Sequence, residues 1–511
     1  MAPKNTDEPE SPLVPKPFSD LLRFMPGFSV SEDSSDDSDE RPDSEKTGIP
    51  SPGALRLDNG HLIEFLCDSL KPVDSSDISP MHWIQIAEKI QLVYADYDGF
   101  IILHGTDTMA YTSSALSFMF ENLDKPVIMT GSQLPIAATR TDAVLNFTNA
   151  IYVAGYQVTG LPLIPEVMIV FADKILRGCR STKVSSSDWA GFDSPNFPQL
   201  GTIGEHIIIN TNILLPRPKG KRFFIKTDLI PRVFNINLFP GFSANPMRKL
   251  FLDQETEGIV LRTYGTGNVP GDAAFLAMIK QSVQGDTLIS LAGDTQSQAI
   301  PNGRLIVNIS QCTQGTVEMG LYEASNRILE QGVLSGLDMT PEAALTKLMW
   351  TLGTQVGDGR VAQLQISQRG EQTENLFDLR YGGVAQSRPV SVFTASAVPD
   401  GRLDRNRISR AMLRLSGLGV TGVENGERVN VKVFMNMPQA DHTTDVSEGR
   451  CVTSLSFMHS TEQPMQTRMQ NITCKTQQVI GHGDVILTLV TSSPQVQLFF
   501  HGLYLTVYAK S

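Results

Sequence analysis

Between residues 97 and 154 the sequence alternates short apolar runs with stretches of helical periodicity. Strand-like runs cover residues 97–105 and 126–131, and each ends in a glycine. Apolar residues recur at helical spacing after each run, and Thr141 and Asp142 stand where the second helix should begin. The order strand, helix, strand, helix predicts right-handed βαβ crossovers and a parallel sheet. Ligands of such sheets bind beyond the carboxyl ends of the strands, which places the segment 105–108 at a candidate site.

The same pattern returns later in the chain and then changes. The apolar runs 258–262 and 305–309 each lead into a turn of small polar residues. Beyond Gly382, short segments alternate apolar and polar residues without a long helical stripe between them. The predicted fold class is therefore α/β, with two parallel-sheet α/β domains followed by a small all-β sandwich.

These changes of pattern divide the chain into four predicted segments. They are a partly disordered acidic N-terminal segment, two α/β domains and an accessory sandwich, with the ranges 1–55, 56–228, 229–385 and 386–511. The serine- and aspartate-rich run 29–40 has too few apolar residues to offset the entropy of ordering, so we expect a mobile loop or tail there. A phosphorylated regulatory segment is the alternative for this run.

Composition narrows the classes of function. The net charge is −12 and no Lys/Arg stripe stands out, so nucleic acid is not expected as a partner. The five cysteines occur singly, which is typical of reduced thiols in the cytoplasm. No apolar run is long enough for a signal peptide or a membrane span. We therefore expect a cytoplasmic protein with no membrane partner.

The sequence does not indicate a metal or a cofactor. The eight histidines form no HExxH pattern. The pair Gly265 and Gly267 lacks the GxGxxG spacing of a nucleotide loop, and Pro270 follows it closely. Neither group is therefore expected in the site.

One short motif places a hydroxyl beside a carboxylate at the end of a predicted strand. Hydrolysis of an amide needs a nucleophile, a base and groups that hold the charged ends of the substrate. In the run 104–109, Thr106 could present its oxygen and Asp107 could accept hydrogen bonds from a substrate ammonium. A helix N-cap is the alternative, because Thr and Asp are both favoured there.

Several motifs resemble the signatures of the L-asparaginase family, especially its cytoplasmic type. In chain order they are DSSD at 74–77, FIILHGTDTMA at 100–110, KPVIMTGSQ at 125–133, RGCRSTK at 177–183 and GLDMTPEAA at 336–344. The resemblance covers about residues 56–375, and HGTDTM is its most specific part. It implies two asparaginase-like α/β domains.

The resemblance also implies the catalytic residues. Thr106, Asp107 and Lys183 match the family's Thr-Lys-Asp group, in which the Lys moves protons and the Thr hydroxyl acts as a nucleophile or activates water. A lysine suits this role because burial and nearby charges readily shift its proton affinity. A solvated surface lysine is the alternative for Lys183.

Substrate-binding residues follow from the same resemblance. Asp74, Ser75 and Ser76 match the loop that binds the α-carboxylate of the substrate, although a plain turn is the alternative there. Thr106 and Asp107 complete that set. Asn268 matches a residue that members lend to a neighbouring subunit, which implies a homodimer or homotetramer.

A second pocket is implied by three further residues. Arg262, Ser310 and Cys312 match positions that form an effector pocket for asparagine in some cytoplasmic members. The turn 294–297 looks like an insertion within this region.

The sequence departs from the family at its first strand. Family members begin with a strand that ends in Thr-Gly-Gly-Thr-Ile and carries the primary nucleophile, and this motif does not occur in the chain. A parallel sheet without that strand would leave backbone groups without partners, at about 1–3 kcal/mol each. That cost favours an incomplete or misassembled start of an enzyme over a genuine non-catalytic isoform.

The predicted function is the hydrolysis of L-asparagine to L-aspartate and ammonia. The substrate is a small amino acid, and the chain as written should be crippled because its first nucleophilic threonine is absent. The alternative is a non-catalytic sensor of asparagine or aspartate, or an interaction protein that acts through its sandwich.

Overall fold

The computed structural model divides the chain into two compact units, Met1–Gln372 and Thr373–Ser511. The described residues are 2–3, 13–14, 28–30, 51–57, 59–68, 70–285, 303–319, 323–373, 375–382, 392–397, 408–424, 427–458, 466–479, 485–500 and 502–509. Of the acidic run 29–40, only Ser29 and Val30 fall among them, at the end of strand β3 (Phe28–Val30). The insertion expected at 294–297 lies outside the described residues.

A six-stranded sheet organises the first lobe of the first unit, in the order β14-β13-β10-β9-β8-β6. Its parallel strands are β6 (Phe100–Leu103), β8 (Val127–Thr130) and β9 (Val167–Phe171). Its antiparallel strands are β10 (Lys174–Arg177), β13 (Gly201–Ile203) and β14 (Ile207–Ile209). The predicted parallel strands are confirmed, but the sheet is mixed because a tight turn at Ala172, with a positive φ of 52°, reverses the chain after β9.

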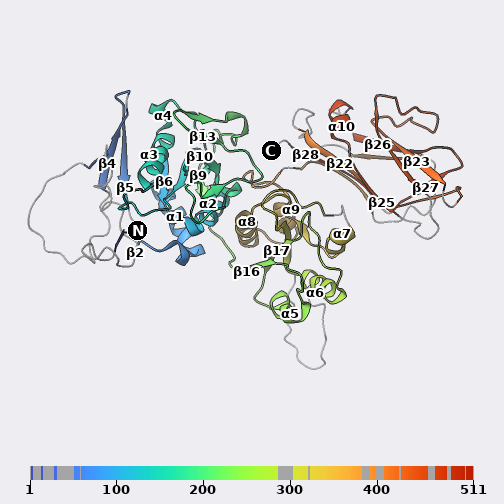
Figure 1. Cartoon of the computed structure of the whole chain (residues 1–511), viewed down its shortest axis with the longest axis horizontal. Helices are drawn as coiled ribbons and strands as arrows, with labels where there is room; N and C mark the ends of the chain where they lie inside the picture. Colours follow the sequence, from blue (N-terminus) through green and yellow to red (C-terminus); the bar gives the residue numbers. More distant parts are fainter. Residues whose placement is uncertain are drawn as a thin grey trace, which may run out of the picture. The chain divides into compact units, whose positions relative to one another are not determined.

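Helices cover both faces of this sheet (Figure 1). On one side lie α1 (Pro80–Val93) and α2 (Met109–Met119), and on the other lies α3 (Ala143–Ala154). Alternate residues of β8 point to opposite sides, so Met129 packs with α2 and Ile128 packs with α3.

Two helix ends differ in detail from the sequence pattern. The second predicted helix begins as expected after Asp142. The Asp142 carboxylate does not cap this helix, because it accepts hydrogen bonds from the backbone amides of Gln133 and Leu134. In the sequence, apolar residues recur at helical spacing as far as Leu123, but the first helix ends at Met119. The chain there enters β7 (Phe120–Glu121), which pairs with β15 (Phe224–Ile225).

The second lobe contains a parallel sheet in the order β16-β17-β18-β19. Its strands are β16 (Val233–Asn237), β17 (Gly258–Thr263), β18 (Leu305–Ser310) and β19 (Leu334–Ser335). Its helices are α5 (Ala244–Leu252), α6 (Ala273–Gln284), α7 (Glu323–Leu329), α8 (Pro341–Thr354) and α9 (Asp358–Gln365). Helix α8 packs against α2, and Phe118 stacks on Trp350 with ring centroids 5.9 Å apart. One hydrophobic core therefore runs through both lobes.

Shorter elements complete the first unit. They are β1 (Ala2–Pro3), β2 (Leu13–Val14), β4 (Ser51–Arg56), β5 (Leu62–Cys67), α4 (Tyr156–Thr159), β11 (Thr182–Lys183) and β12 (Phe192–Asp193). Strands β3, β4 and β5 form a small antiparallel sheet, and β5 packs its Ile63 and Phe65 beside α3. Strands β11 and β12 form a hairpin that carries Lys183.

Strand β6 lies at the edge of its sheet among the described strands. Every residue of β8 and β9 is buried, whereas Leu103 at the end of β6 is 40% exposed. The amides of Phe100 and His104 donate to the carbonyls of Pro126 and Thr130. Because backbone groups alternate in direction along a strand, those of residues 101 and 103 face the open edge.

The second unit is a β-sandwich, so the predicted fold class is confirmed. One sheet contains β20 (Asn375–Gly382), β28 (Gly502–Ala509), β22 (Ile408–Thr421), β25 (Gln466–Asn471) and β27 (Gln497–Phe499). The other contains β21 (Val392–Ala397), β26 (Val485–Thr491), β23 (Arg428–Met435) and β24 (Cys451–Met458). Inward-facing residues of both sheets form one core, and a short helix, α10 (Thr473–Val479), packs beside β22.

Candidate active site

The motif at the carboxyl end of β6 folds into a short 3-10 helix, η3 (Thr106–Thr108), directly before α2. Neither Thr106 nor Asp107 caps a helix, because the N-cap residue is Gly105 and no side chain serves as its cap. The Asp107 side chain is instead 67% exposed, and its carboxylate meets Lys183. The alternative of a helix N-cap is therefore wrong for these two residues.

Lys183 bridges the hydroxyl and the carboxylate. Its Nζ donates to Thr106 Oγ1 over 2.8 Å and to Asp107 Oδ1 over 2.6 Å. The lysine side chain is only 19% exposed, so it is not a solvated surface lysine. Two segments that are distant in the sequence thus meet, and the Lys183 ammonium lies between the Thr106 hydroxyl and the Asp107 carboxylate.

Two contacts from the second lobe hold the chain just before Lys183. Before it, the 3-10 helix η4 (Gly178–Arg180) is fixed by an ion pair in which Arg180 Nη1 lies 2.8 Å from Asp338 Oδ2. Directly before it, Thr182 Oγ1 donates to Glu342 Oε1 over 2.8 Å. Burial raises the pKa of Glu342, and the hydrogen bond from Thr182 offsets that shift only in part. The sequence reasoning named neither Thr182 nor Glu342, although both lie inside the motifs that it quoted.

The loop predicted to bind the substrate carboxylate lies against the same motif. Ser75 begins the 3-10 helix η2 (Ser75–Asp77), and its carbonyl accepts a hydrogen bond from Thr108 Oγ1 over 2.7 Å. A side chain at Gly105 would meet Ser75 Oγ at 2.5 Å, so only glycine allows this approach. The buried Ser75 is therefore brought to the Thr106 turn.

Asp74 has a structural role in that loop. Its Oδ1 accepts hydrogen bonds from Ser76 N and Ser76 Oγ, both over 2.9 Å, and so caps η2. These hydrogen bonds from Ser76 lower the pKa of Asp74. The Asp74 carboxylate and the Ser76 hydroxyl are therefore hydrogen-bonded to each other within the loop.

His104 anchors the start of the motif through a chain of hydrogen bonds. The carbonyl of Gly105 can only accept, so His104 Nδ1 carries the proton and donates to it over 2.6 Å. His104 Nε2 is then an acceptor for the Thr112 hydroxyl over 2.9 Å, and Thr112 Oγ1 in turn accepts from Trp83 Nε1 over 3.0 Å. Burial lowers the pKa of His104, so the ring is neutral where it holds the motif.

We expect His104 to make the stability of the first unit depend on pH. The unfolded imidazole takes up a proton below a pH of about 6.5, whereas the folded one resists it, so stability is lost as the pH falls below that value. In His104→Asn the side-chain amide can still donate to the Gly105 carbonyl. The loss of stability at low pH that His104 causes should therefore disappear. Denaturant unfolding between about pH 5 and pH 8 measures it. If the free energy of unfolding changes with pH equally in the variant and in the parent chain, the assignment is wrong.

The other predicted residues lie in the second lobe, at the carboxyl ends of β17 and β18. Arg262 is the last residue but one of β17, and its Nε is buried without a hydrogen-bond partner among the described residues. Ser310 Oγ donates to the carbonyl of Gly265 over 2.6 Å and accepts from the amide of Cys312 over 3.0 Å. Cys312 is exposed. Ser310 is thus engaged in a turn, while the guanidinium of Arg262 retains a free donor.

Asn268 closes the turn after β17. Its backbone pairs with that of Tyr264 over 2.8 and 3.0 Å. The buried atoms Asn268 Oδ1 and Tyr264 OH have no hydrogen-bond partner among the described residues. Within the described residues, Asn268 Oδ1 makes no hydrogen bond to Thr106 or Lys183 of the same chain.

Two family models match the chain. They are Asparaginase, N-terminal, over residues 37–215, and Glutaminase/Asparaginase C-terminal domain, over residues 232–364. Together they span more than half of the 511 residues. The chain belongs to the asparaginase family. It is therefore an asparaginase-family hydrolase, and the predicted resemblance is confirmed.

Individual relatives of this asparaginase-family chain agree with that result. L-asparaginase 1 of Escherichia coli (strain K12) is 43% identical over 305 residues, which make up 59% of this chain and 82% of that protein. The crystal structure of L-asparaginase I from Vibrio cholerae is similar with a TM-score of 0.51 and 40% identity, covering 59% of this chain and 84% of that one. The 60 kDa lysophospholipase of Homo sapiens is 37% identical over 303 residues, but the match spans only 48% of that protein.

Two searches of the described residues bear on cofactors and membranes. Within these residues, no group of three or more His, Cys, Asp or Glu side chains is placed to hold a metal ion. Among their helices, none is both long enough and apolar enough to cross a membrane.

Proposed function

We propose that this chain provides the amino-acid site of an L-asparagine hydrolase, whose products are L-aspartate and ammonia. One observation carries the proposal: Lys183 Nζ lies within hydrogen-bond distance of both Thr106 Oγ1 and Asp107 Oδ1. Related proteins named L-asparaginase support the substrate class. The Thr-Lys-Asp group is therefore proposed as catalytic, although its nucleophilic partner strand is absent from the sequence.

Each group has a definite task in this proposal. The exposed Asp107 carboxylate accepts hydrogen bonds from the α-ammonium of the substrate, and the Ser75 and Ser76 region takes the α-carboxylate. In the observed state Lys183 donates to Thr106 Oγ1, so the lysine must become a neutral amine before the hydroxyl can give up its proton. The neutral amine takes the proton of the attacking oxygen, that oxygen adds to the side-chain amide carbon, and the amine returns the proton to the departing nitrogen as the C–N bond breaks and ammonia leaves. If the Thr106 hydroxyl attacks, water then hydrolyses the acyl-enzyme ester to L-aspartate and restores the hydroxyl; if water attacks directly, L-aspartate forms in the same step.

The second candidate is a sensor that binds asparagine or aspartate without turnover. It is favoured by the absence of Thr-Gly-Gly-Thr-Ile from the sequence, since binding groups remain while the first nucleophile does not. Ammonia release separates the two candidates, and binding alone is common to both.

Binding of L-aspartate provides the first test. In Asp107→Asn the ammonium loses a charge-assisted partner worth about 1.5–3 kcal/mol, so we expect Kd to rise by roughly 10- to 100-fold. Isothermal titration calorimetry on the full chain measures this change. Asp173→Asn is the matched control, because Asp173 is exposed in the turn between β9 and β10. Equal affinity in the parent chain and Asp107→Asn would refute the site.

Further assignments belong to the same proposal. Arg262 is proposed to bind the carboxylate of an effector amino acid, with Ser310 and Cys312 beside it, and its free buried donor supports this. Asn268 is proposed to reach the site of a neighbouring copy in a homodimer or homotetramer, and its free buried oxygen is in keeping with this role. A cytoplasmic location remains part of the proposal.

A further inference from the structure

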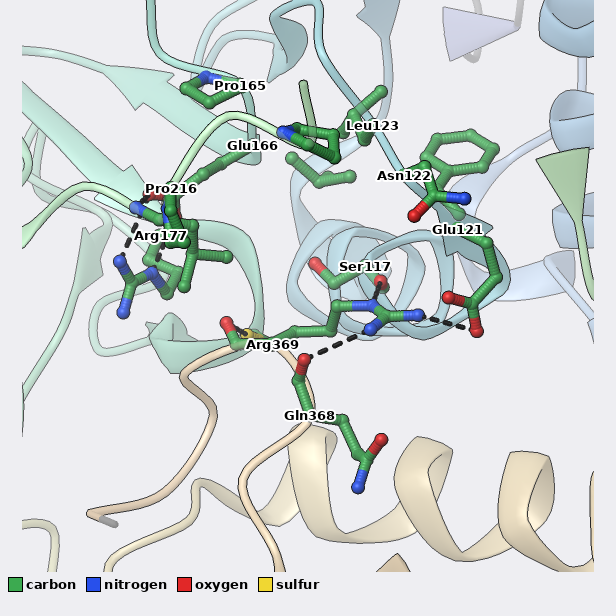
Figure 2. A pocket seen from close by; sticks show the side chains of 15 residues that line it. Ser117, Glu121, Asn122, Leu123, Pro165, Glu166, Arg177, Pro216, Gln368 and Arg369 are labelled. Atoms are coloured by element: carbon green, nitrogen blue, oxygen red, sulfur yellow. Dashed lines mark hydrogen bonds and ion pairs between the residues drawn. The ribbon is translucent and has the colours of Figure 1, made fainter. Parts of the chain in front are cut away.

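A second cavity lies in the first unit, away from the Thr106 and Lys183 group. Its volume is about 220 Å³. Its walls come from the end of α2, the start of β9, the end of β10, the loop after β14 and the loop after α9. The lining residues are Ser117, Phe120, Glu121, Asn122, Leu123, Pro165, Glu166, Val167, Arg177, Cys179, Leu215, Pro216, Pro218, Gln368 and Arg369. Figure 2 shows them around the opening.

The charges of the lining residues cancel in two ion pairs. Arg177 Nε lies 2.6 Å from Glu166 Oε2, and both side chains are almost completely buried. Arg369 Nη2 lies 2.9 Å from Glu121 Oε1, at a more exposed position. Lys226 also reaches Glu121 Oε1, over 3.0 Å, from outside the lining. A ligand with a large net charge would find little compensation here, because both acids already have a cationic partner.

One end of the cavity retains hydrogen-bonding capacity. Both contacts of Glu121 use Oε1, so Oε2 is available as an acceptor. Asn122 donates through Nδ2 to the carbonyl of Arg222 over 3.0 Å, and Figure 2 shows its amide oxygen on the side of the cavity. Arg369 Nη1 uses one hydrogen on the carbonyl of Gln368 over 3.0 Å and retains a second. Two acceptors and one donor therefore lie close together.

The rest of the lining combines the buried Arg177 and Glu166 ion pair with apolar side chains. The apolar side chains are those of Leu123, Val167, Pro165 and Pro216. Burial raises the pKa of the Cys179 thiol to about 12, so this group also stays uncharged. The volume is below the range of roughly 300–1,000 Å³ that is usual for drug-sized ligands. The space suits a compact molecule with an apolar body.

We propose that this cavity binds a free amino acid with an apolar side chain. Its ammonium is held by Glu121 Oε2 and Asn122 Oδ1, its carboxylate by Arg369, and its side chain by the proline, valine and leucine walls. The head group carries one charge of each sign, so binding leaves the net charge of the cavity unchanged. This ligand class differs from L-asparagine and L-aspartate, whose polar side chains are proposed to bind at the Asp107 site.

Calorimetric titration of the full chain with L-leucine tests the proposal. We expect one site with a Kd of roughly 0.1–1 mM, unaffected by saturating L-aspartate. The anion 4-methylpentanoate, the cation 3-methylbutylamine and the polar zwitterion L-serine each lack one required feature, so each should bind at least about 10-fold more weakly. Absence of L-leucine binding, or equal binding of any of these three probes, overturns the assignment.

Cavity-filling variants locate the site. Leu123→Trp places an indole in the cavity, and Pro216→Trp does the same from an exposed loop, where folding is less at risk. Both should raise the Kd for L-leucine at least about 10-fold, because the added ring occupies the space of the ligand side chain. Leu145→Trp is the matched control, since Leu145 is 63% exposed on α3. If Pro216→Trp folds and binds L-leucine as the control does, the site lies elsewhere and the proposal fails.

Discussion

Supplying this chain with a first strand that ends in Thr-Gly-Gly-Thr-Ile is expected to raise ammonia release from L-asparagine by about 10⁴- to 10⁶-fold. The expectation follows from the site, where Lys183, Thr106 and Asp107 are already in contact but the primary nucleophile of the family is absent from the sequence. If Lys183 is the proton carrier as proposed, adding one nucleophile to this site should restore most of the rate. Steady-state ammonia production by the purified extended chain measures it.

The fold has an open position for such a strand. Among the described strands β6 is an edge strand, and the backbone groups of residues 101 and 103 face away from β8. A parallel strand added there would end level with Gly105 and bring its last residues beside Thr106. Parallel sheets are normally covered on both faces, and β6 meets this condition through the cores around α1 and α3.

Two controls separate chemistry from a general gain in stability. The same added strand with valine in place of both threonines should pair with β6 equally well but leave ammonia release at background. In the active extended chain, Lys183→Met should lower kcat by about 10²- to 10⁴-fold, because proton transfer is lost. Lys89→Met, at an exposed ion pair with Asp68, should leave kcat unchanged. If the chain extended with Thr-Gly-Gly-Thr-Ile releases ammonia only at the background rate, the result favours the amino-acid sensor over the asparagine hydrolase.

Local pattern predicted the elements that position the site. The apolar run before His104 became β6, and the runs at 258–262 and 305–309 became β17 and β18. These predictions succeeded because buried parallel strands are short, apolar and bounded by glycine or small polar turns, all of which are readable within a few residues. The sandwich was readable because its strands alternate apolar and polar residues. Its elements β20, β25 and α10 were not anticipated.

Contacts between the lobes were beyond the reach of local pattern. The hydrogen bond from Thr182 to Glu342 joins residues 160 positions apart, and the Arg180 and Asp338 contact joins residues 158 positions apart. No periodicity within either segment specifies such a partner. The family resemblance supplied Lys183 as a neighbour of Thr106, whereas composition alone favoured a helix cap at Thr106 and Asp107. The second cavity had no sequence signal, because five separate segments build it.

The ion pair between Lys347 and Glu371 should dominate the stability of the first unit. Both side chains are completely buried, and Lys347 Nζ lies 2.6 Å from Glu371 Oε1. The ammonium also donates to the carbonyls of Leu364 and Ile366 and to Gln372 Oε1. Burial lowers the pKa of Lys347, and the pair with Glu371 opposes this shift without reversing it. Burial alone would raise the pKa of Glu371, but the charge of Lys347, its hydrogen bond and the backbone amide hydrogen bonds together outweigh burial and lower that pKa.

Glu371→Gln is expected to reduce the free energy of unfolding by about 3–5 kcal/mol at neutral pH, because it leaves the lysine charge buried without its counter-ion. Denaturant unfolding with a near-UV signal measures the loss, and Glu330→Gln at an exposed site should change stability by less than about 0.5 kcal/mol.

The loss of stability in Glu371→Gln should depend on pH. In the variant, folding favours the neutral amine, so the unfolded chain binds more protons and stability rises with pH toward the unfolded lysine pKa of about 10.5. The difference in the free energy of unfolding between the variant and the parent chain should therefore become smaller between about pH 7 and pH 9. A difference that stays constant over this range would show that lost packing, not an unpaired charge, is its cause.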